Sequence, residues 1–168
     1  MAGNVKETVK TESSLSRLTR SFSIILAAIL LALPQISIAF LGLRFLPLNI
    51  IYFWIGAIIT AGGLYFSVWA RQYLGNNWSQ AVTIKDDHKL ITNGPYALVR
   101  HPIYTGLLLG FVGTALALGE WRGVISVVLV FCVLLHKLRL EDKWLLEQFG
   151  SEYEVYCQKV SALIPYII

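Results

Sequence analysis

The sequence has few charged residues: Asp, Glu, Lys and Arg make up only 14% of its 168 residues, where a soluble domain carries about 25%. Hydrophobic residues make up 56% of the chain and gather in long runs. This composition excludes an ordinary soluble domain and predicts one compact unit integral to a membrane. A nucleic-acid-binding role is excluded as well, because the net charge is only +4 and no basic face with base-reading residues is visible.

Cysteines and the common catalytic motifs are equally scarce. Cys132 lies inside an apolar run, Cys157 lies in a polar region, and neither belongs to a CxxC pair. Because the two are expected at different depths, neither a disulfide nor a metal site is predicted. The sequence also lacks a glycine-rich phosphate loop, an HExxH motif and a recognisable Ser/His/Asp set.

Four apolar segments are predicted to cross the membrane. The first contains Pro34 near its middle, where a kink is expected. The third is short, and the fourth is expected to continue past His136 as the same helix. These segments cover residues 21–43, 49–70, 103–118 and 124–135.

Lys and Arg residues are distributed unevenly between the segments that connect these spans. Twelve lie in residues 1–20, in the long polar segment 71–102 and after the fourth span, whereas only Arg44 and Arg122 lie in the other two turns. The positive-inside rule then places both termini and segment 71–102 in the cytoplasm. The predicted fold is an all-α, multi-pass membrane protein of one domain (1–168). It has about four transmembrane helices, with five as the alternative, and a cytoplasmic amphipathic C-terminal helix.

A polar segment with two prolines, residues 93–106 (NGPYALVRHPIYTG), directly precedes the third span. Polar backbone and charge at a membrane edge are costly, so such a segment needs a reason. Pro102 suits the first turn of a helix, which puts Arg100 and His101 at its mouth. One reading is a ligand site; the other is an Arg100 that reaches lipid head groups beside an interfacial His101.

A second charged string, residues 137–143 (KLRLEDK), follows the fourth span. Lys137 and Glu141 are i,i+4 neighbours on a helix, so the string is either a self-paired charge cluster or a site. As a site, the acidic group would bind a cationic or hydroxyl-rich ligand, and the basic group would hold an anion. Gly106 and Gly110 form a GxxxG spacing, which permits close helix packing within one chain or between two.

Taken together, these strings resemble the isoprenylcysteine carboxyl methyltransferase family and its phospholipid methyltransferase relatives. The N-terminal half resembles them only as generic membrane helices. Lys137 stands where the prenylcysteine enzymes typically have arginine, and Asp142 stands where glutamate is commoner. The matching residues are 88–96, 100–106, 141–145, 149–153, Tyr156, Ile164 and Pro165.

The resemblance implies an enzyme that uses S-adenosylmethionine to methylate a lipid-like acceptor, most readily the carboxylate of a prenylated cysteine. It implies a cofactor-binding catalytic region over residues 88–165, facing the cytoplasm. The implied catalytic residues are Arg100, His101 and Glu141, and the implied acceptor-binding residues are Lys137 and Arg139. The implied cofactor contacts are His88, Leu90, Ile91, Tyr96, His101, Pro102, Ile103, Tyr104 and Glu141.

Other functions remain open at the level of sequence. The same scaffold could methylate a phospholipid amine or a small thiol, and His101 or Glu141 would then take up a proton. From a different class, the chain could be a non-catalytic membrane scaffold or a small transporter. A transporter more often places ionisable groups at mid-membrane, where these spans have essentially none. The expected partners are membrane lipids and the lipidic acceptor, not nucleic acid; the oligomeric state stays open.

Overall fold

The computed structural model describes residues 13–75 and 90–165. Over these two ranges the regular elements are all helical, and one isolated backbone bridge stands in place of any strand. The all-helical prediction is confirmed. The elements are α1 (Ser14–Ala32), η1 (Pro34–Ile36), α2 (Ala39–Gly42), α3 (Ile50–Leu74), η3 (Gly94–Ala97), α4 (Pro102–Leu118), α5 (Trp121–Phe149) and α6 (Ser151–Lys159).

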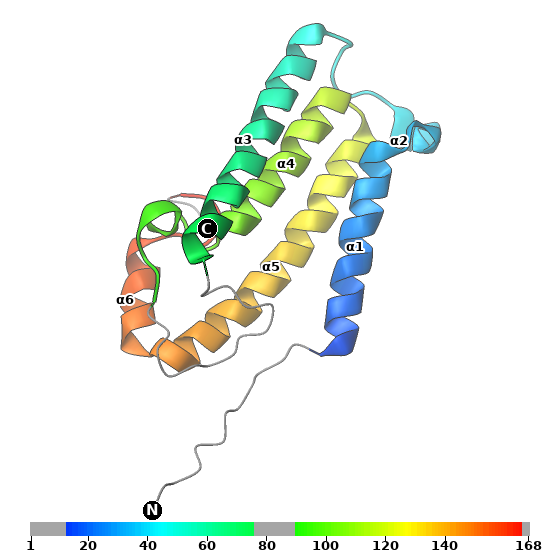
Figure 1. Ribbon diagram of the computed structural model, residues 1–168. Coiled ribbons are helices and arrows are strands. Elements are labelled where there is room, and N and C mark those ends of the chain that lie inside the picture. Colours follow the sequence, from blue (N-terminus) through cyan, green and yellow to red (C-terminus); the bar gives the residue numbers. More distant parts are fainter. Residues whose placement is uncertain (1–12, 76–89, 166–168) are drawn as a thin grey trace, which may run out of the picture.

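The four long helices lie side by side in the order α3, α4, α5, α1 (Figure 1). Successive long helices run in opposite directions, so the start of α1, the end of α3, the start of α4 and the end of α5 lie at one end of the molecule. Helix α6 folds back beneath this same end. The two charged strings of the sequence therefore meet there, although they lie far apart along the chain.

The helices present apolar side chains outwards. Helices α1, α3 and α5, of 19, 25 and 29 residues, are long and apolar enough to cross a membrane, and α4 is a shorter apolar helix of 17 residues. Phe22 and Ile58 are 66% and 69% exposed. Faces of this kind belong in lipid and not in water, so the chain is an integral membrane protein, as predicted.

The first helix differs from its prediction. A single span over residues 21–43, kinked at Pro34, is wrong, because α1 covers Ser14–Ala32 and does not continue through the proline. The helix starts early because the Ser13 hydroxyl accepts a hydrogen bond from the backbone N–H of Ser16 at 3.2 Å and caps it. It stops early because a proline has no N–H to donate and disfavours helix in the residue before it.

A buried arginine completes the end of α1. Arg122, in the first turn of α5, donates from Nη1 to the carbonyl oxygens of Leu30 and Leu33, at 2.9 and 2.8 Å. Its Nε donates to Glu120 at 2.7 Å. Carbonyls at a helix end have no partner in their own helix, so Arg122 stabilises the point where α1 stops.

Helices α3 and α4 pack backbone to backbone through small residues. A methyl group on Gly63 would lie only 2.6 Å from the carbonyl oxygen of Gly106, and one on Gly106 would clash with Gly63 and Ser67. The Ser67 hydroxyl donates to the carbonyl of Ile103 at 3.0 Å. The glycine spacing of the third span is thus used inside the chain.

Helix α5 continues without a break past His136, as predicted, and carries the second charged string below the apolar spans. It ends at Gly150, whose φ of 52° lets the chain reverse because glycine adopts positive φ without strain. Helix α6 follows at once and packs against the last part of α5.

Candidate active site

The backbone of His101 is fixed by its place at the start of α4 and by hydrogen bonds to the segment that follows α6. His101 is the N-cap of α4, and Pro102 begins the helix as the sequence predicts. The N–H groups of Arg100 and His101 donate to the carbonyls of Ser161 and Ala162, at 2.8 and 2.9 Å. The chain after α6 therefore holds the turn that leads into α4, and the His101 side chain is only 6% exposed.

The imidazole of His101 lies between two carboxylates of α5. Its Nε2 is 2.7 Å from Oδ1 of Asp142, and its Nδ1 is 3.6 Å from Oε2 of Glu141. Burial by itself lowers the pKa of His101, but the hydrogen bonds and negative charges of Asp142 and Glu141 outweigh it and raise the pKa above its usual 6.5. The two carboxylates therefore favour the protonated form of the ring.

Glu141 gathers donors from two helices. Its Oε1 accepts a hydrogen bond of 2.7 Å from the Tyr104 hydroxyl and lies 3.0 Å from Nζ of Lys137. The Tyr104 ring stacks on His101 with centroids 5.6 Å apart and planes 13° from parallel. Lys137 also lies over the ring of Trp144, 5.5 Å from its centroid, which is within the range of a cation–π contact.

Asp142 is the second carboxylate of this site, and we call His101, Glu141, Asp142 and the side chains bonded to them the cluster. Its Oδ2 accepts from Nη2 of Arg100 at 3.0 Å, and its Oδ1 accepts from the Tyr153 hydroxyl of α6. Burial and the Asp142 charge raise the pKa of Tyr153, so this hydroxyl stays a donor. Arg100 also donates from Nη1 to the carbonyl of Val160 at 2.6 Å. Asp142 thus joins α4, α5 and α6.

The segment before α4 forms a further wall of the site. Tyr96, in η3, is 8% exposed, and burial together with the nearby Glu141 charge raises its pKa to about 12. The backbone carbonyl of Tyr96 accepts a hydrogen bond of 2.6 Å from the Tyr156 hydroxyl of α6. Helix α6 therefore holds η3 beside Glu141.

The structure brings most of the predicted site residues to this one place, but not all. Arg139 is exposed and lies about 200° around α5 from Lys137. Leu90 and Ile91 are half-buried at the start of the second described range, and Ile103 turns its carbonyl to α3. His88 lies outside the described residues. The residues brought together are Tyr96, Arg100, His101, Pro102, Tyr104, Lys137 and Glu141.

Asp142 and Tyr153 belong to the cluster although neither was predicted to be a site residue. A signal for both existed, since each lies inside a string on which the family resemblance rests. Asp142 follows directly after Glu141, and Tyr153 closes the string 149–153. What the strings could not indicate was that Tyr153 bonds Asp142, because that contact depends on the reversal at Gly150.

The side chains of the cluster suit a ligand that carries both charges. Glu141 and the Tyr104 and His101 rings offer negative charge and π faces to a cation, while Lys137 and Arg100 offer donors to an anion. Nε of Arg100 is buried and has no hydrogen-bond partner among the described residues. Within those same residues, no group of three or more His, Cys, Asp and Glu side chains is arranged to hold a metal ion.

Comparison with known proteins gives a consistent result. The sequence model of a family described as phospholipid methyltransferase matches residues 51–152. A probable protein-S-isoprenylcysteine O-methyltransferase of Oryza sativa subsp. indica is 37% identical over 112 residues, which are 66% of this chain and 53% of that protein. The Saccharomyces cerevisiae protein-S-isoprenylcysteine O-methyltransferase is 33% identical over 116 residues, 67% of this chain and 48% of its own.

A solved structure shares the fold. The eukaryotic intramembrane Ras methyltransferase named isoprenylcysteine carboxyl methyltransferase superposes with a TM-score of 0.64 at 24% identity, over 94% of this chain and 55% of that one. The multi-pass helical architecture and the resemblance predicted from the sequence are thereby confirmed. The chain spans about half the length of the curated relatives it matches.

Proposed function

The chain belongs to the phospholipid methyltransferase family, and from this premise we propose that it is an S-adenosylmethionine-dependent methyltransferase of the membrane. Its proposed acceptor is the carboxylate of a lipid-like molecule, such as a prenylated cysteine. The observation that carries the proposal is the cluster in which His101, at the start of α4, lies between Glu141 and Asp142 of α5. The names of the similar proteins support this class of acceptor.

Several side chains of the cluster would hold the cofactor. When bound, S-adenosylmethionine supplies an electrophilic methyl group on a sulfonium centre. The Glu141 carboxylate and the stacked Tyr104 and His101 rings suit a cationic ligand of that kind, and Tyr96 flanks them. The remaining predicted contacts stay part of this proposal: His88, Leu90, Ile91, Pro102 and Ile103.

The state of His101 favours a carboxylate acceptor over an amine or a thiol. A carboxyl group with a pKa near 4 is ionised at neutral pH, so it needs no general base. Both nitrogens of His101 face carboxylates, Asp142 and Glu141, which favour its protonated form, so it is poorly placed to act as a base. Its proposed role is to hold both carboxylates in position. Positioning and desolvation then account for most of the catalysis.

Lys137 is the proposed partner of the acceptor carboxylate. Its ammonium lies 3.0 Å from Glu141, so an acceptor anion bound to Lys137 would lie next to the cofactor's proposed place. Arg139 is the second predicted acceptor-binding residue. We propose it for this role less strongly than Lys137, because it faces away from Lys137. The catalytic region is proposed to span residues 88–165 and to face the cytoplasm, on the strength of the twelve-to-two distribution of Lys and Arg.

A second candidate acceptor is the amine of a phospholipid, which the description of the matching family favours. A methyl-transfer assay distinguishes the two acceptors. Membranes or detergent-purified protein are incubated with radiolabelled cofactor and a panel of acceptors. The panel contains an S-prenylated cysteine carboxylate, phosphatidylethanolamine and a small thiol. Label in the prenylated carboxylate supports the proposal; label only in the phospholipid replaces it with the second candidate.

Binding of S-adenosylmethionine to the detergent-purified protein, measured by calorimetry, tests the proposal directly. We expect Glu141→Gln to weaken binding about tenfold, because hydrogen bonds to a charged group contribute about 1.5–3 kcal/mol. Glu147→Gln, an exposed position on the same helix, is the matched control and should bind as the wild type does. Absence of binding to the wild-type protein would refute the proposed function. Equal affinity in both variants would mean that Glu141 does not hold the cofactor.

A further inference from the structure

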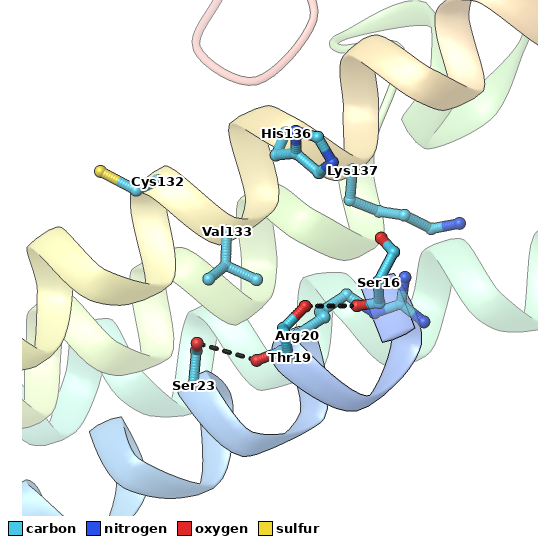
Figure 2. Close-up of a pocket in the computed structure, with 8 residues that line it drawn as sticks. All are labelled: Ser16, Thr19, Arg20, Ser23, Cys132, Val133, His136 and Lys137. Atoms are coloured by element: carbon cyan, nitrogen blue, oxygen red, sulfur yellow. Dashed lines mark hydrogen bonds between the residues drawn. The ribbon is translucent and has the colours of Figure 1, made fainter. Parts of the chain in front are cut away.

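A groove lies between the first part of α1 and the middle of α5, with a volume of about 220 Å³. Figure 2 shows the two helices facing each other across it. Farther along, the helices close against each other, where the buried Ser126 hydroxyl donates to the carbonyl of Ala27 at 2.7 Å. The groove therefore opens at the same end of the molecule as the candidate active site. Its lining residues are Ser16, Thr19, Arg20, Ser23, Cys132, Val133, His136 and Lys137.

The α1 side of the groove is formed by polar residues of the first turns of the helix, which also carry Ser14, Arg17 and Ser21 outside the groove. The groove residues occupy positions 16, 19, 20 and 23, the spacing of one helix face. Leu18 and Phe22, between them, are exposed on another face. The Thr19 and Ser23 hydroxyls donate to carbonyls of their own helix, at 3.0 and 2.8 Å. The groove residues thus lie in the polar part of α1, at the end of the molecule that holds the candidate active site.

The charge of the groove has one sign. Arg20 contributes a guanidinium from α1, Lys137 contributes an ammonium from α5, and His136 adds a third basic side chain. No acidic residue is among the eight that line it. The groove also leads directly to the candidate site, because Lys137 lies 3.0 Å from Glu141. It is complementary to an anion bound beside the cluster.

The size of the groove sets what fits inside. Pockets for small molecules typically measure about 300–1,000 Å³, so about 220 Å³ suits a head group and the first part of a chain. The apolar part of such a ligand would continue into the lipid beside α1 and α5. An amphiphile with a carboxylate head matches both the charge and the volume.

We infer that this groove receives the carboxylate head of the acceptor, and that Arg20 binds it together with Lys137. The inference rests on the proposed function and adds a specificity-determining residue from α1, outside the catalytic region 88–165. Two basic groups from different helices can bind both oxygens of one carboxylate, and a guanidinium does so with a planar fork of donors. A neutral ester product would lose these charged contacts and leave.

Arg20→Gln tests the inference, with Arg17→Gln as the matched control. Arg17 lies on the same helix and is exposed outside the groove. We expect Arg20→Gln to raise the acceptor KM about tenfold, because a charged hydrogen bond is lost. The kcat and the Kd for S-adenosylmethionine should not change. Arg17→Gln should behave as the wild type, and Arg20→Lys should restore most of the affinity.

Three results would overturn the assignment. Equal KM values for Arg20→Gln and Arg17→Gln would show that Arg20 does not contact the acceptor. Loss of cofactor affinity along with acceptor affinity would show a structural role. A KM effect that appears only in vesicles containing anionic phospholipid, and not in zwitterionic detergent, would mean that a lipid head group occupies the groove.

A second measurement does not depend on turnover. Cys132 lines the groove and is exposed, whereas Cys157 does not line it, so mass spectrometry can follow alkylation of each by N-ethylmaleimide. We expect an S-prenylated carboxylate to slow alkylation of Cys132, and its methyl ester to slow it much less. Protection without methyl transfer would keep the groove assignment while the proposed function fails. Absence of protection by the carboxylate would overturn the assignment.

Discussion

His101, at the start of α4, is held by contacts of both its backbone and its ring. Its backbone N–H bonds to the segment after α6, its ring stacks on Tyr104, and its two nitrogens face Asp142 and Glu141. Arg100 and Tyr153 surround the same carboxylates. A neutral imidazole would leave two half-buried carboxylates with less compensation, so protonation of His101 stabilises the folded site.

This arrangement predicts a pH dependence of stability. Because the pKa of His101 is raised in the folded state, its contribution is fully present below about pH 6.5, the unfolded value, and is lost as pH rises through the raised pKa. We expect the free energy of unfolding to fall as the pH rises above about 6.5 and through the raised pKa of His101. Thermal unfolding in detergent across this range measures it.

The comparison variant is His101→Gln, which cannot titrate. Its unfolding temperature should be lower at pH 6 and should change much less with pH than that of the wild type. An unchanged pH slope in His101→Gln would assign the dependence to another group and would contradict a raised pKa of His101.

Among the helices, α3 and α4 form the pair whose packing requires the closest approach of two backbones. Their contact is made through backbone at Gly63 and Gly106, with Ser67 bonded to the carbonyl of Ile103. Van der Waals packing and such short hydrogen bonds, rather than the exclusion of water, hold helices together in lipid. The position of Pro102 and His101 follows from this seam, because both lie at the start of α4.

Two glycines of α4 allow a matched test. A methyl group at Gly106 would clash with Gly63 and Ser67, whereas at Gly110 its nearest neighbour would be Leu64 at 3.9 Å, an ordinary contact. We expect Gly106→Ala to destabilise the protein by about 1–3 kcal/mol and Gly110→Ala to have little effect. Unfolding temperatures of the two variants in the same detergent decide. Equal temperatures would mean that α3 and α4 do not pack as closely as described.

At the scale of the whole molecule, the alternation of the long helices brings distant charges to one end. Residues 93–106 and 137–143 meet there, together with Arg17 and Arg20 of α1 and Arg71 of α3. Arg44 and Glu120 pair at the other end, 3.8 Å apart. The charge asymmetry and the site therefore share one side of the membrane.

The orientation follows as a prediction: the end with the site faces the cytoplasm. In a protein whose Cys132 and Cys157 are replaced by serine, Ser13→Cys and Leu48→Cys place single thiols at opposite ends. A membrane-impermeant maleimide added outside intact cells or sealed right-side-out vesicles should label Leu48→Cys at once. It should label Ser13→Cys only after the membrane is opened. The reverse pattern would overturn the orientation.

Much of the fold was predicted from local sequence features, and the helix bounds that were predicted wrongly also have local causes. The spans behind α3 and α4 were predicted because apolar runs that begin at Asn49 and just after Pro102 are strong helix signals, and the apolar run 124–135 predicted the membrane part of α5. The first span was misplaced because hydropathy alone discounted the polar turn capped by Ser13 and ran on through Pro34. Hydrogen bonding, not hydropathy, sets those two bounds.

The sequence by itself determined the class of the protein, a multi-pass helical membrane protein, and the two strings that carry chemistry. Length, apolar runs and turn formers act locally, so they can be read without a fold. Only the tertiary structure decided that Asp142 joins His101 to Arg100 and Tyr153 and that Arg20 faces Lys137 across a groove. Those relations depend on the rotation of helices and the reversal at Gly150, which long-range packing sets and no local pattern encodes.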